Sequence, residues 1–282
     1  MNYGKWRRGE KHKNLVNALI SEEVMAAIVR PEWRLLLTGF GNSYMNMGID
    51  ESILIHRSRG ENAPTIRLYG WSTPTVSIGY FQRLGEEVDL DKAMQLGVGY
   101  VRRISGGGSV LHEHEVTYSI VVSEMDPRIP SDIQESIQLI CGGIIRGLRE
   151  LGVDAEFKPV NDVVVGGRKV SGSAQTRKFQ TVLQHGTVLL DVDRPKALSI
   201  LKNVAKTMKG RFSDELREHI AGINEYVREG VSFQSLNEAL VRGFEEELGI
   251  KLVKGALSVS ENDLAAKLSA SKYSTREWNH LR

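Results

Sequence analysis

Cysteine is almost absent from this chain, since Cys141 is the single cysteine among 282 residues. One thiol allows no internal disulfide and no multi-cysteine metal site, and this usage is typical of a reducing cytoplasm. Net charge is also scarce, because 37 basic residues face 35 acidic ones. A protein whose main partner is nucleic acid usually concentrates a basic excess, so we expect no nucleic-acid partner.

Long apolar runs are missing too. No run approaches the roughly 20 residues that span a bilayer, and no apolar signal-peptide core follows the basic start. We therefore expect a cytoplasmic protein without a membrane partner. Residues 1–30, with Lys5, Arg7 and Arg8 near their start, are expected to be an N-terminal extension. It is either an arm for an acidic partner or a solvated terminus, and residues 15–29 are expected to form a short helix. Residues 31–282 are expected to form one domain.

Strand-like segments dominate the first two thirds of this domain, and helical ones follow. The expected strands are residues 34–38, 65–69, 75–80, 99–103, 117–123, 162–165 and 182–191. The expected helices are residues 46–57, 131–151, 213–228, 235–248 and 260–269, with a short turn at 274–278. Helix 131–151 has capping-box spacing at Ser131 and Gln134, and Gly152 follows it as a C-terminal glycine. This order favours an α+β fold, a mixed sheet flanked by helices with a helical C-terminal segment.

Three consecutive glycines follow two arginines in Arg102-Arg103-Ile104-Ser105-Gly106-Gly107-Gly108-Ser109. Bare backbone of this kind forms nests of N–H groups that bind phosphate oxygens, and Arg103 would add charge-assisted contacts. The motif is neither a Walker A loop nor a dinucleotide fingerprint. A surface salt bridge is the alternative role for Arg103.

Lys169 lies between a predicted strand and the small-residue run Ser171-Gly172-Ser173-Ala174. Its ammonium could neutralise charge that develops on a reacting carboxylate and phosphate. The alternative is an ordinary surface lysine. Asp162, after Asn161, is the candidate ligand for Mg²⁺, and the alternative is an Asx turn that opens the strand.

The histidines and the cysteine are weaker candidates. His112 and His114 would share one face of a strand, but no second cluster completes a zinc site. His112 is expected to line a ligand pocket beside the glycines, and His185 to cap or pack. Cys141 lies on the apolar face of helix 131–151, so we expect a buried structural thiol.

Taken together, these motifs resemble the lipoate–protein ligase family, in a form with the catalytic domain only. The resemblance covers residues 33–192, with a weaker match at 273–278. The motifs that carry it are Asn46-Met47, Tyr69-Gly70-Trp71, Ser77-Ile78-Gly79-Tyr80-Phe81-Gln82, residues 102–112, Asn161-Asp162, residues 167–175 and His185-Gly186-Thr187.

The resemblance implies the biotin/lipoate protein ligase fold for residues 31–282 and an ATP-dependent reaction. Lipoate or octanoate would attack ATP to give an acyl-adenylate, and a lysine of a lipoyl domain would then accept the acyl group. ATP, Mg²⁺ and lipoate are the implied cofactors and substrates. The implied catalytic residue is Lys169. The implied ATP-binding residues are Arg103, Gly106, Gly107, Gly108, Ser109, Val110, Leu111, Asn161, Asp162 and Lys169. The implied lipoate-binding residues are Ile78, Gly79, His112 and Lys169.

The implied partners are lipoyl domains, on the E2 subunits of 2-oxoacid dehydrogenases or on the glycine cleavage H protein. Related ligases carry an accessory C-terminal domain that this chain lacks, so a separate accessory polypeptide is a further expected partner.

One segment departs from the ligase pattern. A Gly-Asn pair is typical after the loop histidine, but here the sequence is His112-Glu113-His114-Glu115, which is nearer to the octanoyltransferase branch. Those transferases use a cysteine just before the Gly-Arg-Lys motif, where this chain has Val160-Asn161-Asp162. We therefore expect the ATP-dependent ligase. An ATP-independent octanoyl- or lipoyltransferase is the alternative, with a non-catalytic binding module and a biotin ligase behind it.

Overall fold

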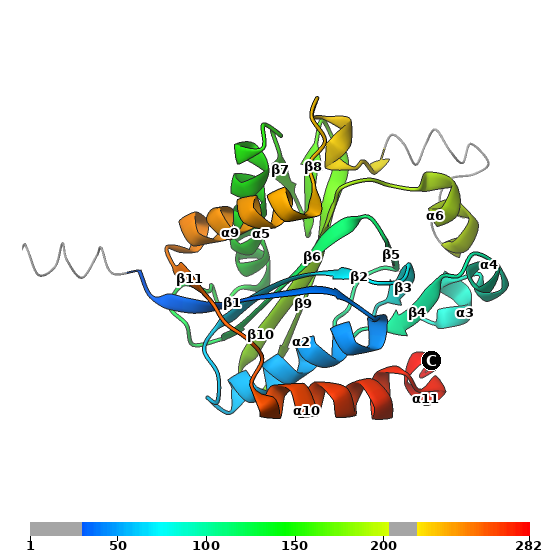
Figure 1. Cartoon of the computed structure of the whole chain (residues 1–282), viewed down its shortest axis with the longest axis horizontal. Helices are drawn as coiled ribbons and strands as arrows, with labels where there is room; N and C mark the ends of the chain where they lie inside the picture. Colours follow the sequence, from blue (N-terminus) through cyan, green and yellow to red (C-terminus); the bar gives the residue numbers. More distant parts are fainter. Residues whose placement is uncertain (1–29, 203–218) are drawn as a thin grey trace, which may run out of the picture.

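An eight-stranded mixed sheet forms the centre of the computed structural model, which describes residues 30–202 and 219–282 (Figure 1). Its strands, in spatial order, are β11 (Lys251–Lys254), β1 (Glu32–Gly41), β2 (Thr65–Trp71), β6 (Glu115–Ser123), β10 (Thr181–Leu189), β9 (Arg168–Lys178), β8 (Asp162–Val165) and β7 (Glu156–Lys158). The pairs β11–β1 and β1–β2 are parallel, and the others are antiparallel.

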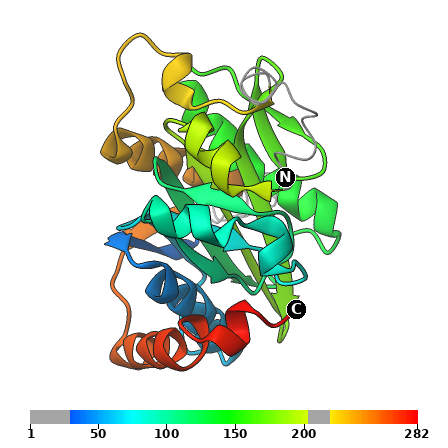
Figure 2. The ribbon, with the colours of Figure 1, turned by 90° about the vertical axis from the view of Figure 1, so that its right-hand side faces the viewer.

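A smaller sheet lies at one end of the large one, with short helices around it (Figure 2). Its order is β4 (Gly99–Arg102), β3 (Thr75–Ile78) and β5 (Val110–His112). Its own apolar core includes residues of α3 (Leu84–Glu87), α4 (Leu90–Gln95) and α6 (Arg194–Ile200). The chain passes from this sheet into the large one between His112 and Glu115, so this crossing brings polar side chains of both sheets together.

Two long helices, α5 (Ile133–Glu150) and α9 (Phe233–Leu248), cover one face of the large sheet (Figure 1). Every second residue of a strand points to the same face. On β6 these are Val116, Tyr118, Ile120 and Val122, and all four belong to the core under α5 and α9. The two helices approach closely through glycines, since a Cβ at Gly243 would lie 2.2 Å from the carbonyl oxygen of Gly143.

The other face of the large sheet is covered by α2 (Ser43–Ser58), against which α10 (Val259–Leu268) packs (Figure 1). The C-terminal segment then continues through a π-helical turn (Ser269–Tyr273) to α11 (Arg276–Asn279). On this face the alternate strand positions are partly polar: Arg67, Tyr69 and Trp71 on β2, Thr117 and Ser119 on β6, and His185 on β10 are all buried. Buried polar groups require hydrogen-bond partners, and α2 supplies one of them through Asp50.

The mixed α+β sheet flanked by helices is confirmed, but several element predictions are wrong in detail. Helix 131–151 begins after Asp132, whose side chain accepts from the Glu135 amide, so Ser131 is not its cap. The predicted C-terminal glycine is confirmed, because Gly152 has φ +78°. The strands β5, β7, β9 and β11 were not predicted, and β11 adds a strand to the segment expected to be helical.

Two predictions concern residues that the structure leaves partly or wholly undescribed. The N-terminal extension and its helix at 15–29 lie outside the described residues. Of the predicted helix 213–228, the described part contains a short 3₁₀ turn, Ile223–Glu225. Among the described residues, no helix is long and apolar enough to cross a membrane.

Candidate active site

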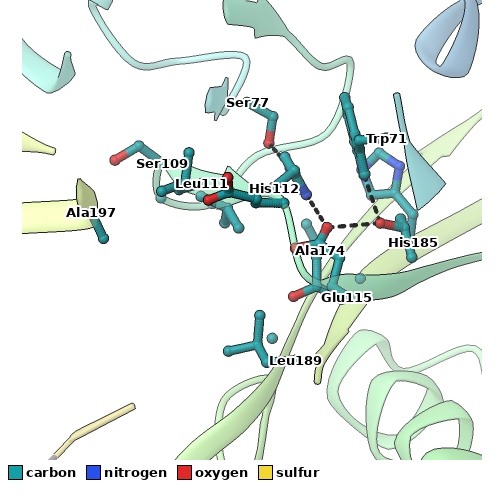
Figure 3. Close-up of a pocket in the computed structure, with 18 of the residues that line it drawn as sticks. Trp71, Ser77, Ser109, Leu111, His112, Glu115, Ala174, His185, Leu189 and Ala197 are labelled. Carbon is teal, nitrogen blue, oxygen red and sulfur yellow. Dashed lines mark hydrogen bonds and ion pairs between the residues drawn. The ribbon is translucent and has the colours of Figure 1, made fainter. Parts of the chain in front are cut away.

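A pocket opens between the two sheets, at the point where the chain crosses from β5 to β6 (Figure 3). Its lining comes from β3, from the loop of residues 105–109 (the glycine loop), and from β5, β6, β9 and β10. One part of the wall is apolar, and its members are Leu111, Leu189, Val192, Ala197, Leu201 and Ile220. Another part is polar and includes Ser77, His112, Glu115, Thr117, Lys169 and His185. The pocket therefore offers an apolar compartment beside a group of hydrogen-bonding side chains.

The glycine loop is held by the two arginines that precede it. Arg103 donates to the carbonyl oxygens of Gly106 and Gly108, both at 2.7 Å, and to Ser77. Burial lowers the pKa of Arg103 to about 10, so it remains a cation at neutral pH. Arg102 is fully buried and donates to the carbonyl oxygens of Trp278 and Asn279 in the C-terminal turn. The alternative of a surface salt bridge for Arg103 is therefore wrong, because its guanidinium lies inside and braces the loop.

Lys169 lies on β9 at the wall of the pocket, and its side chain is 36% exposed. Its ammonium pairs with the Asp162 carboxylate, with an Nζ–Oδ1 distance of 2.6 Å. The side chain crosses Gly172, where a Cβ would lie 2.6 Å from its Nζ. Glycine at 172 therefore leaves the space that this lysine occupies. Asn161 binds the carbonyl oxygen of Ser173 and also lines the pocket.

Ser77, His112 and Glu115 form a continuous hydrogen-bonded group that we call the open relay (Figure 3). Ser77 Oγ lies 2.7 Å from His112 Nε2, and His112 Nδ1 makes a short hydrogen bond to Glu115 Oε1. The His112 ring stacks on Trp71, with centroids 4.0 Å apart. Register places Ser77 two residues beyond Thr75, the pairing partner of His112 across β3 and β5.

The donors at both ends of the open relay fix the direction of its protons. Trp71 Nε1 can only donate, and it donates to Thr117, so the Thr117 hydroxyl donates to Glu115. The Glu115 carboxylate accepts, which makes His112 Nδ1 a donor. Arg103 also can only donate, and it donates to Ser77 Oγ at 3.1 Å. The Ser77 proton therefore points at His112 Nε2, the arrangement in which a histidine acts as base toward a serine.

Ser105, His185 and Asp50 form a second group of the same kind, the enclosed relay. Ser105 Oγ lies 2.6 Å from His185 Nε2, and His185 Nδ1 lies 3.2 Å from Asp50 Oδ2. Asp50 also accepts from Arg67 and Tyr69. Burial alone would raise the pKa of Asp50, but Arg67 and the hydrogen bond from His185 outweigh it and hold the pKa below its ordinary 3.8. Of this relay only His185 reaches the lining of the pocket among the described residues.

Cys141 is fully buried on α5, as the sequence predicted. Burial raises the pKa of its thiol to about 11, only partly opposed by the hydrogen bond to Ser173. Nucleophilic cysteines react as thiolates, so this thiol is unsuited to attack an acyl group at neutral pH.

The structure gathers most of the predicted site residues at one pocket. Those that line it are Arg103, Gly107, Gly108, Ser109, Val110, Leu111, His112, Asn161 and Lys169. Ile78 and Gly79 do not appear in this lining among the described residues; Ile78 is in the core of the small sheet. Gly79 packs against the glycine loop, since a Cβ there would lie 2.1 Å from the Gly107 carbonyl oxygen. Asp162 meets an ammonium group, which occupies the position that a Mg²⁺ ligand would need free.

Three functional candidates were missed from the sequence: Ser77, Glu115 and Asp50. Asp50 carried a usable signal, because a carboxylate on the apolar side of a helix is rarely buried without a partner. Ser77 and Glu115 carried none on their own, since 38 residues separate them in the sequence.

Comparison with known proteins agrees with this geometry. The family model described as lipoyl protein ligase A/B catalytic domain matches residues 42–245. Octanoyltransferase LipM of Kyrpidia tusciae is 43% identical over 270 residues, which cover 88% of this chain and 98% of that protein. Octanoyltransferase LipM of Bacillus subtilis is 36% identical over 89% of this chain and 98% of its own length. The bi-partite lipoate protein ligase of Thermoplasma acidophilum superimposes with a TM-score of 0.79, at 32% identity over 89% of this chain and 98% of that one.

These relatives correct the expected chemistry. Those at 36% and 43% identity bear the name of a transferase, and an octanoyl group moves from a donor in which it is already activated. The expectation of an ATP-dependent ligase that uses ATP, Mg²⁺ and free lipoate is therefore wrong. The sequence had pointed away from the transferase because no cysteine precedes the Gly-Arg-Lys motif. The need for an accessory polypeptide, which was tied to adenylation, stays a prediction.

Proposed function

Because this chain belongs to the family of lipoyl protein ligase A/B catalytic domains, we propose that it is an octanoyltransferase acting in protein lipoylation. In this proposal residues 31–282 form the catalytic domain. It moves an octanoyl group from the thioester of an acyl carrier protein, or of a second lipoyl domain, to a lysine amine of a lipoyl domain. The acceptor domain belongs to an E2 subunit of a 2-oxoacid dehydrogenase or to a glycine cleavage H protein.

The pocket supports this proposal through its two compartments. A saturated eight-carbon chain gains about 0.8 kcal/mol for each methylene that leaves water, and the apolar wall from Leu111 to Ile220 offers that environment. The thioester carbonyl then lies toward the polar wall, where Lys169 is the exposed cation.

Lys169 carries the proposal. Attack on a thioester carbonyl builds negative charge on its oxygen, and a fixed cation stabilises that charge most where water is partly excluded. The ion pair with Asp162 at 2.6 Å holds the ammonium in place and keeps it protonated. The amide forms as the C–S bond breaks, and the amine proton leaves with the thiol.

Intact-mass measurement tests the proposal. The protein is incubated with octanoyl–acyl carrier protein and an E2 lipoyl domain, without ATP, and we expect one octanoyl group on the lipoyl domain. Lys169→Met lowers the rate about 10²–10³-fold, as loss of an oxyanion donor does. Lys254→Met, at an exposed lysine of β11, serves as the matched control and keeps the rate. If transfer occurs only after ATP is added, or with neither mixture, the proposal is wrong.

A further inference from the structure

Transfer between two protein-bound partners raises the question of where the acyl group rests. The thioester donor and the lysine acceptor each ride on a separate protein, and a covalent acyl-enzyme lets them use one pocket in turn. A cysteine is the usual carrier for such a step, but the one thiol of this chain is buried in α5 and holds its proton at neutral pH. Another nucleophile must lie at the pocket if a covalent route is used.

The open relay has the geometry of an activated serine. We propose, on the basis of the octanoyl transfer proposed above, that Ser77 Oγ receives the acyl group as an ester, with His112 as its base and Glu115 as the residue that positions His112. The three side chains come from β3, β5 and β6, so each is fixed by a strand. All three border the pocket, and the proton direction derived above leaves His112 Nε2 free to accept the serine proton.

A cation lies beside the same oxygen. Arg103 Nη1 donates to Ser77 Oγ at 3.1 Å, and Arg103 stays charged because its pKa is about 10. As the proton passes to His112, this guanidinium stabilises the growing negative charge on Oγ. Lys169 lies in the same lining and is the second cation available to the carbonyl oxygen.

The two half-reactions balance. In the first, the bond from Ser77 Oγ to the acyl carbon forms and the C–S bond of the donor breaks; His112 takes the serine proton and gives it to the leaving thiolate. In the second, the lysine amine of the lipoyl domain attacks the ester, and the amide C–N bond forms as the C–O bond breaks. His112 takes a proton from the amine and returns it to Ser77 Oγ.

The enclosed relay provides the internal contrast. Ser105 has the same partners in the same order, yet it is fully buried and stands outside the pocket lining among the described residues. Its oxygen also lacks an arginine such as the one that Ser77 has among the hydrogen bonds described. Only Ser77 combines a base, a cation and access to the pocket.

Trapping the acyl-enzyme tests the inference. The full-length protein is mixed with octanoyl–acyl carrier protein in the absence of a lipoyl domain, quenched in acid and analysed by intact mass and peptide mapping. We expect one octanoyl ester on the peptide that contains Ser77. Ser77→Ala abolishes the adduct, whereas Ser105→Ala removes the equivalent hydroxyl of the enclosed relay and retains it. Circular dichroism of each variant separates loss of fold from loss of reaction.

Ser77→Cys provides a chemical signature and a test of Glu115. The adduct becomes a thioester, which neutral hydroxylamine cleaves while it spares the serine ester. Glu115→Gln slows adduct formation about 10²-fold in the serine enzyme, in the range of base catalysis, and less in Ser77→Cys because a thiol needs less help from a base. An equal cost in both backgrounds would make Glu115 a purely structural residue and overturn its role.

The outcomes distinguish this inference from the function on which it rests. Lipoyl-domain labelling by the wild type without an adduct, and with unchanged labelling by Ser77→Ala, would overturn the serine carrier and leave the octanoyltransferase standing. Absence of both adduct and labelling would remove the proposed function itself.

Discussion

The open and enclosed relays contain the same three kinds of side chain, hydrogen-bonded in the same order, yet they differ in their surroundings. In the open relay Ser77 receives a hydrogen bond from Arg103 and all members border the pocket. In the enclosed relay the carboxylate of Asp50 is the most heavily bonded member, and it joins α2 to β2, β6 and β10. Hydrogen-bond order alone therefore does not separate chemistry from support. Access and the position of the nearest cation do.

Replacement of the base in the open relay is expected to have the largest effect. His112→Asn lowers the single-turnover rate of octanoyl transfer by about 10²–10⁴-fold, because the Ser77 proton loses its acceptor. Quenched-flow mass spectrometry measures this rate. A loss of less than about threefold would show that the two relays are alike in being structural.

Loss of the carboxylate in the enclosed relay is expected to act on stability instead. Asp50→Asn leaves the guanidinium of Arg67 buried without its counter-charge, and the free energy of unfolding falls by about 3–5 kcal/mol. Urea denaturation measures this difference. A wild-type-like midpoint would contradict the supporting role given to this relay.

The pH dependence of that difference sharpens the assignment. The native pKa of Asp50 lies below its ordinary 3.8, so its contribution is complete above that pH and is lost as pH falls through the native value. The gap between wild type and Asp50→Asn is therefore constant near neutrality and narrows below 3.8. A gap that widened on acidification would reverse the sign we give.

The smallest effect is expected at Cys141, which lies outside both relays. Cys141→Ser exchanges one buried group for another that can still bond to Ser173, so unfolding should cost about 1 kcal/mol and octanoyl transfer should persist. Transfer assays with and without iodoacetamide check this. Inactivation by the substitution would return the carrier role to the thiol.

The local periodicities of the sequence were enough to predict the α+β class and the helix on which Cys141 lies. The segment around Lys169 shows where such reasoning fails. Its small residues were interpreted as a loop that leaves room for a ligand, but they belong to the eleven-residue strand β9. They are small because neighbouring strands and Lys169 itself pack against them: a Cβ at Gly186 would lie 2.5 Å from the Gly172 carbonyl oxygen.

The gathering of Arg103, His112 and Lys169 at one pocket was predictable from motifs. The partners that give these residues their roles were not, since they depend on strand register and on the crossing between two sheets. Glu115 meets His112 only because that crossing takes two residues, and Ser77 meets it across the β3–β5 pair. A single sequence contains the alternation but not the register.

Arg102 has a practical consequence. Its guanidinium ties the residues before the glycine loop to the carbonyl oxygens of Trp278 and Asn279, and the Trp278 indole donates back to Arg102. The last few residues of the chain therefore act as a clasp on the catalytic wall. Affinity tags, fusions or proteolytic trimming at this end will disturb the pocket, although none of them comes near it in sequence.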